Sequence, residues 1–156
     1  MRFFFAVSLM LTLLLPSLAE AEDLPAAFIG TWIKAISPNL KCTRADWTGP
    51  AGDERIISVN EREILDYESG CRILGVKVKH APGGDPSYAD AVVDLACGGE
   101  GMSSRLQEVW HLGTVEGRKL FTTTSIRQWD YRDDTGRRMK PPFPFEMETS
   151  VYLECK

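Results

Sequence analysis

The end of the chain alternates between apolar and polar side chains over eleven residues, and this pattern constrains the fold more than any other feature of the sequence. Successive side chains of a β-strand point to opposite faces of a sheet, so such alternation predicts a strand with one buried and one wet face. The residues expected on the buried face are Phe145, Met147, Thr149, Val151, Leu153 and Cys155. Those expected on the wet face are Glu146, Glu148, Ser150, Tyr152 and Glu154.

The chain between residue 22 and this final strand reads as further short strands separated by turns. No segment has a convincing helical period, and turn-forming residues recur about every eight to twelve positions. The segments expected as strands are 28–34, 55–60, 63–68, 71–79, 88–97, 103–112 and 119–126. We predict an all-β fold, a single antiparallel up-and-down barrel of about eight strands, with a sandwich as the alternative.

The four cysteines predict two disulfide bonds. Facing residues of an antiparallel hairpin are equidistant from its turn, and the midpoint between Cys71 and Cys97 is Gly84, inside a Pro- and Gly-rich turn. A hairpin folded there places these two cysteines opposite one another on the same face. We therefore predict a Cys71–Cys97 bond, which leaves Cys42 to pair with Cys155. The second bond would bring the first and last strands together, as closure of a barrel requires.

Residues 1–21 are expected to be a signal peptide. Arg2 precedes a run at 3–15 that is apolar except at two positions, and Ala19-Glu20-Ala21 supplies the small residues that a signal peptidase reads. The run is shorter than the roughly 17–25 residues of a membrane-spanning helix, although an N-terminal anchor is the alternative. We expect an exported protein, in the bacterial periplasm or secreted, with one domain at 22–156. Export also fits the even number of cysteines.

Gly30-Thr31-Trp32 resembles the G-x-W signature on the first strand of lipocalins and related calycin barrels. The resemblance implies that Trp32 packs across the closed end of the barrel and that Gly30 lets the chain bend close beneath it. The order of this motif, the stretch 97–101 (Cys-Gly-Gly-Glu-Gly) and a final Tyr152-x-x-Cys155 is also similar to small exported bacterial proteins. The lipocalin Thr-Asp-Tyr signature is missing from this chain.

A more remote resemblance is to bacterial periplasmic inhibitors of secreted metalloproteases. These are similar in size to this chain and are short barrels with a G-x-W first strand. The resemblance implies that the short arm at 22–27 would enter the cleft of a protease. It is a likeness of fold, and fold alone does not establish function.

The sequence contains no recognisable catalytic constellation. His80 is expected in a turn and His111 at the end of a strand, and neither G-x-S-x-G nor H-E-x-x-H occurs. The glycines at 98–101 fit a tight turn better than a phosphate loop, because no helix follows them. We expect no enzyme, no metal and no cofactor, with a hydrolase of novel site as the alternative. The formal net charge of −4 argues against a nucleic-acid partner.

The segment 127–145 combines aromatic and basic side chains, the types enriched at binding hot spots. It is expected to form a long hairpin with the stretch 133–136 (Asp-Asp-Thr-Gly) near its tip. The alternative is a solvated hairpin whose aromatic rings pack on the barrel mouth. The candidate binding residues are Trp129, Tyr131, Arg132, Arg137 and Arg138. We expect a binding or interaction protein that contacts a protein or envelope partner; the alternatives are a carrier of a small apolar ligand and a protease inhibitor.

Overall fold

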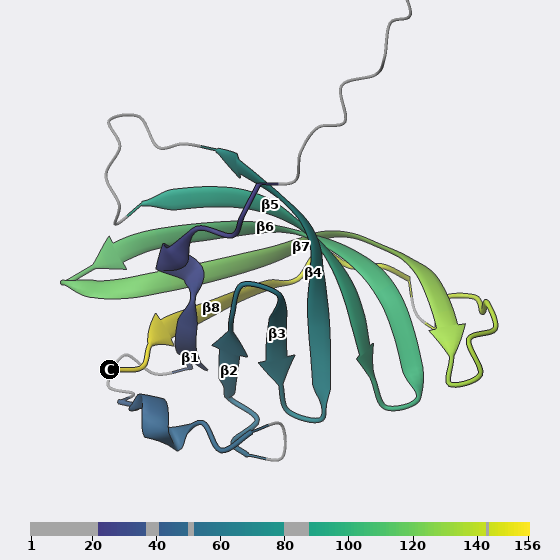
Figure 1. The fold of residues 1–156 in the computed structure, drawn as a ribbon, viewed down its shortest axis with the longest axis horizontal. Helices are drawn as coiled ribbons and strands as arrows, with labels where there is room; N and C mark the ends of the chain where they lie inside the picture. Colours follow the sequence, from purple (N-terminus) through teal and green to yellow (C-terminus); the bar gives the residue numbers. More distant parts are fainter. Residues whose placement is uncertain (1–21, 37–40, 50–51, 80–87, 143) are drawn as a thin grey trace, which may run out of the picture.

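The protein is an eight-stranded antiparallel barrel in a computed structural model that describes residues 22–36, 41–49, 52–79, 88–142 and 144–156 (Figure 1). Two single-turn 3₁₀ helices precede β1 and β2. The elements are η1 Ala26–Phe28, β1 Gly30–Lys34, η2 Arg44–Asp46, β2 Ile56–Val59, β3 Glu63–Asp66, β4 Ser69–Lys79, β5 Ala89–Gly99, β6 Met102–Val115, β7 Arg118–Asp133 and β8 Thr149–Glu154. The predicted up-and-down barrel is confirmed, and the sandwich is not formed.

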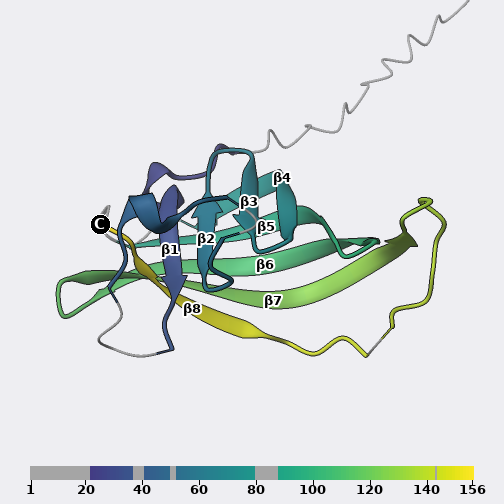
Figure 2. The same ribbon diagram turned by 90° about the horizontal axis from the view of Figure 1, so that it is seen from below.

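Each strand pairs with its sequence neighbour, and β8 closes the barrel by pairing with β1. The strands differ greatly in length, since β4 to β7 have 11 to 16 residues whereas β1, β2, β3 and β8 have 4 to 6. In Figures 1 and 2, β6 and β7 therefore run well past the small barrel wall made by β1, β2 and β3. The long strands thus carry two large faces, an inner one that continues the barrel interior and an outer one.

Aromatic rings fill the interior beneath η1. Phe28, Trp32, Trp110 and Phe121 are all fully buried, and Phe121 lies 5.1 to 5.5 Å, centre to centre, from the other three rings. The indole nitrogen of Trp32 donates a hydrogen bond to the carbonyl oxygen of Phe28 at 3.0 Å. Trp32 is therefore part of the packed aromatic interior.

Gly30 is required for a different reason from the expected close approach. A Cβ atom at this position would come no nearer than 3.7 Å to the Trp32 indole nitrogen, which is an ordinary contact. The backbone φ of Gly30 is +155°, however, and L side chains rarely adopt this conformation. The glycine is explained by its dihedral angle and not by lack of space.

The alternation predicted for the last strand is present in β8, but its faces are reversed. Paired residues of neighbouring strands point to the same face. Tyr152 pairs with Phe121 and packs on the interior core, whereas Leu153 pairs with Ile33 in a separate cluster outside the barrel. Leu153 and Cys155 are nevertheless buried, because Cys42 and Trp47 are packed against that outer cluster.

The predicted strand is also too long at its beginning. β8 starts at Thr149, and the side chains of Phe145 and Met147 are 38% and 75% exposed. The expectation that these two residues belong to a buried face is therefore wrong. Three prolines between residues 141 and 144 remove backbone donors just before this stretch, which disfavours an earlier start of the strand.

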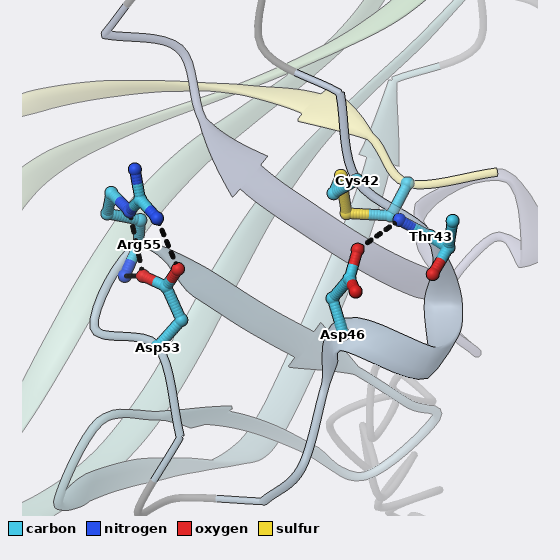
Figure 3. The surroundings of a disulfide bond; sticks show 6 residues. Cys42, Thr43, Asp46, Asp53 and Arg55 are labelled. Atoms are coloured by element: carbon cyan, nitrogen blue, oxygen red, sulfur yellow. Dashed lines mark hydrogen bonds and ion pairs between the residues drawn. A yellow bond between two sulfur atoms is a disulfide. The ribbon is translucent and has the colours of Figure 1, made fainter.

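Both predicted disulfides are present, Cys71–Cys97 and Cys42–Cys155. The first joins directly paired residues of β4 and β5, although a bulge between Ile73 and Gly75 shifts the register beyond it by one residue. The second fixes the segment that carries η2 against the end of β8 (Figure 3). Next to Cys42, the backbone amide of Thr43 donates a hydrogen bond to the carboxylate of Asp46 at 2.6 Å. Thr43 is the N-cap residue of η2.

Candidate binding surface

Arginines from three long strands meet on the outer face of the sheet. Ile73, Leu95 and Leu106 pair across β4, β5 and β6 and pack with the interior core, so the residues adjacent to them point outward. One outward row runs across four strands through the paired residues Arg72, Ala96, Arg105 and Trp129. We call the outer surface formed by Arg72, Arg105, Arg127, Trp129, Asp130, Arg132 and Arg138 the arginine face.

The arginine face is hollowed by two adjoining depressions. One, of about 430 Å³, is lined by Arg72, Arg105, Asp130 and Arg132 among others. The other, of about 540 Å³, is lined by Arg105, Arg127, Trp129, Asp130 and Arg138 among others. Arg105 and Asp130 belong to both linings. The two depressions therefore form one continuous basic trough across the strands.

Asp130 binds two of the arginines on one side of this trough. It occupies an irregularity in the β6–β7 register and has a φ of +54°. Its Oδ1 atom accepts hydrogen bonds from Arg132 and Arg138, each at 3.1 Å. The hydrogen bonds from Arg132, and then those from Arg138, lower the pKa of Asp130 below its ordinary value. One carboxylate thus holds two guanidinium groups side by side.

The remaining arginines of the trough lack such a partner. Within the described part of the chain, Arg72, Arg105 and Arg127 form no ion pair. The guanidinium carbon of Arg127 lies 4.7 Å from the ring centre of Trp129, at cation–π distance. Asp94 also lines the trough, but its Oδ1 accepts a hydrogen bond from the Gln107 side chain at 2.7 Å. The surface therefore has an excess of positive charge.

The structure separates the five candidate residues of segment 127–145. Trp129, Arg132 and Arg138 lie together on the arginine face. Tyr131 lines a different pocket, on the inner face. Arg137 stands at the tip, where its side chain is 84% exposed and pairs with Asp133. The proposed set is thus one group of three residues and two separate residues.

The predicted long hairpin is only partly formed. Residues 127–133 continue β7, which pairs with β6 and is a wall of the barrel. The turn does lie at the expected place, where the Asp133 carboxylate accepts hydrogen bonds from the backbone amides of Thr135 and Arg137. Among the described residues of the returning limb, pairing with β7 is confined to the neighbourhood of Arg138, which forms a bridge to Arg132.

Four residues of the arginine face were not predicted as binding residues: Arg127 and Asp130, which lie within segment 127–145, and Arg72 and Arg105, which lie outside it. Arg72 and Arg105 come from β4 and β6, and neither lies in a segment with a distinctive composition. Their proximity follows from strand register, because both pair with Ala96. Extending the Cys71–Cys97 alignment by one residue would have given the Arg72–Ala96 pair.

Glu108 is a buried carboxyl group on the inner face. It pairs with Val93 and Ser125, and only 8% of the residue is exposed. Its Oε2 atom accepts a hydrogen bond from the Trp110 indole at 2.7 Å, and its Oε1 atom accepts one from the Ser125 hydroxyl at 3.0 Å. Burial raises the pKa of Glu108 above its ordinary value of 4.5.

We expect Glu108→Gln to increase the free energy of unfolding at neutral pH. Because the folded-state pKa is raised, the folded protein binds more protons than the unfolded chain between the two pKa values, and stability falls as the pH rises through that window. Urea unfolding at several pH values should show a higher free energy of unfolding for the variant than for the wild type at neutral pH, and this difference should shrink towards about pH 4. The exposed Glu61→Gln is the control. If the free energy of unfolding has the same pH dependence in Glu108→Gln and in the wild type, the pKa of Glu108 is not raised by folding.

Comparison of this chain with protein-family models, with curated proteins and with solved structures finds no match. In the ranges that the structure describes, no cluster of His, Cys, Asp and Glu side chains could hold a metal ion. None of the described helices is long and apolar enough to cross a membrane. The two disulfides fit an oxidising, extracytoplasmic compartment.

Proposed function

We propose that this protein is an exported, non-enzymatic binding protein whose arginine face docks on an acidic surface of a partner protein. The observation that supports the proposal is the meeting of five arginines and Trp129 in one trough, with Asp130 and Asp94 as its carboxylates. The chain as a whole has a formal charge of −4. Such a local reversal of charge favours an anionic partner.

The residue types favour a protein over a lipid surface. Arginine binds carboxylates through two parallel hydrogen bonds, whereas lysine acts as a point charge. Arginine and tryptophan are also the residues most enriched in the hot spots of protein interfaces. The trough contains arginine and no lysine among the residues that line it. Its two depressions suit a partner with protruding carboxylates.

The packing of the interior supports the alternative carrier function less well. Four fully buried aromatic rings and Leu24 fill the interior under η1 and occupy the space that an apolar ligand would need there. We therefore propose a likeness to the lipocalin-like barrels in fold and not in ligand carriage. The position of Trp32 at the packed end supports it.

The inhibitor alternative requires a free N-terminal arm. In the structure the backbone amide of Glu22 donates to Val76 at 3.2 Å, and the Glu22 carboxylate accepts from the amide of Val78. Leu24 is 6% exposed. Residues 22–27 are thus docked on the barrel, which favours the arginine face over the arm as the binding surface.

Charge reversal on the arginine face should abolish partner binding. The purified protein is immobilised and exposed to exported proteins at about 50 and about 300 mM salt, since exposed charges are screened at high ionic strength. We expect capture of an acidic protein at low salt, with recovery reduced by more than about tenfold for Arg105→Glu/Arg127→Glu.

Lys77→Glu is the matched control, because Lys77 lies on the outer face of β4, away from the trough. It introduces a negative charge on the same sheet and should change recovery little. Equal loss of recovery in both variants, or a captured protein that remains bound to Arg105→Glu/Arg127→Glu, would remove the arginine face from the interaction.

A further inference from the structure

The inner face of the long strands holds a pocket of about 330 Å³, and no residue of the arginine face lines it. The Cys71–Cys97 disulfide, which joins β4 to β5, is part of its lining. Tyr67, beside β3, and Tyr131, on β7, also line the pocket. The pocket lies beyond the aromatic core, since none of the four fully buried rings is among its lining residues. Its lining includes Tyr131 and the glycines that follow Cys97, none of which belongs to the arginine face.

The polar groups of the pocket are almost all neutral. Ser69, Ser104 and Gln128 contribute hydroxyl and amide groups, and the only carboxylate among the lining residues is that of Glu100, in the exposed β5–β6 turn. No lysine or arginine lines the pocket. A charged ligand would therefore lose its hydration without gaining an opposite charge. The lining selects for a ligand that is polar but uncharged.

The hydrogen-bonding groups are already arranged. The Gln128 side-chain amide donates to the Ser104 hydroxyl oxygen at 3.0 Å. This bond uses one amide proton and one lone pair, so the carbonyl oxygen of Gln128 remains an acceptor and the hydroxyl proton of Ser104 remains a donor. Both kinds of group face the same pocket, where a ligand that carries several hydroxyl groups would satisfy them.

The pocket wall is also fixed in shape. Gly98 and Gly99 line it without side chains, and a Cβ atom at Gly99 would meet the Ser69 Cβ at 2.8 Å. The disulfide prevents β4 and β5 from separating at this level. A volume of about 330 Å³ lies at the lower end of the range for small-ligand pockets. It is large enough for one sugar ring and too small for a long lipid chain.

We propose that this pocket binds a neutral saccharide unit. The tyrosine rings pack against the ring of the sugar, while Gln128, Ser104 and Ser69 hydrogen-bond its hydroxyl groups. The pocket borders the arginine face, since Cys97, Gly98, Ser103 and Ser104 line both the pocket and one of the two depressions. Gln128 and Tyr131 line the pocket and neither depression, whereas the five arginines line the depressions and not the pocket. Variants at these residues therefore test the two sites separately.

The test is a titration of the isotope-labelled full chain, followed by two-dimensional NMR, with glucose and N-acetylglucosamine as separate probes. We expect at least one sugar to shift the backbone amide signals of residues 69–71, 97–99 and 103–104, with a dissociation constant of about 1 mM, typical of a weak single-ring ligand. No shift at about 50 mM of either sugar would overturn the proposal. So would equal shifts with a blocked dipeptide or a fatty acid.

Gln128→Ala and Tyr131→Ala are the variants, and Gln107→Ala is the matched control. Gln107 is on β6 and lies on the outer face, where it bonds to Asp94. We expect Gln128→Ala to weaken sugar binding at least about fivefold, equivalent to one hydrogen bond, and Gln107→Ala to leave it unchanged. Should Gln128→Ala lose its folded spectrum, Tyr131→Ala still removes a ring that packs against the sugar and should also weaken binding. Equal affinities in the wild type and in every folded pocket variant would refute the site.

Discussion

Replacement of Cys42 and Cys155 by alanine is expected to lower the free energy of unfolding by about 5 kcal/mol. The bond links residues 113 positions apart, so its loss greatly increases the conformational freedom of the unfolded chain. The loss also frees the segment that covers the outer cluster of Ile33, Ile56 and Leu153. Urea unfolding, monitored by tryptophan fluorescence, measures the change.

The matched comparison is Cys71→Ala/Cys97→Ala. This bond spans 26 positions, and its removal should cost about 3.5 kcal/mol by the same loop-entropy relation. It links strands that are already paired along their length, so its removal frees no segment of the chain. An equal or greater loss for the 71–97 variant would show that the terminal bond does not hold the barrel closed.

Phe121→Ala is expected to destabilise the protein by about 3 to 5 kcal/mol, the usual cost of removing a buried aromatic side chain. Phe121 is fully buried and contacts the rings of Phe28, Trp32 and Trp110. Because it is surrounded by rigid rings, the cavity cannot close without moving them. The midpoint and slope of urea unfolding give the change in free energy.

Phe145→Ala is the control for this substitution. Phe145 precedes β8 and is 38% exposed, so its removal should change stability by only about 0.5 kcal/mol. The comparison also tests the boundary of β8, since the sequence pattern alone places Phe145 on the buried face. A loss at Phe145 similar to the loss at Phe121 would contradict the packing described above.

The scaffold was predictable from sequence because local patterns determine it. Turn residues and alternation gave the barrel, and the position of Gly84 between Cys71 and Cys97 gave one disulfide and hence the other. The direction of the two faces of β8 was not predictable in this way. Leu153 is buried by a segment more than a hundred positions away in the sequence, around Cys42, and alternation cannot distinguish an outer cover from an inner core.

The candidate site was only partly predictable. Composition drew attention to Trp129, Arg132 and Arg138, which lie together. Arg72 and Arg105 lie beside them only because four strands, β4 to β7, pair in this register. Tyr131 lies apart from them because an irregularity in the β6–β7 register turns it to the inner face. A search confined to loops would also have missed the site, since all but Arg138 of its arginines lie on strands.

The most direct test of the proposed function is photo-crosslinking in cells, with a photoreactive amino acid placed at Ala96 or at Ser69. Ala96 lies between Arg72 and Arg105 on the outer face, and Ser69 lines the inner pocket. We expect an adduct with an acidic protein from position 96, none from position 69, and loss of the adduct when Arg105→Glu/Arg127→Glu is added. A protein adduct from position 69 alone, or one from position 96 that survives the charge reversal, would contradict binding through the arginine face.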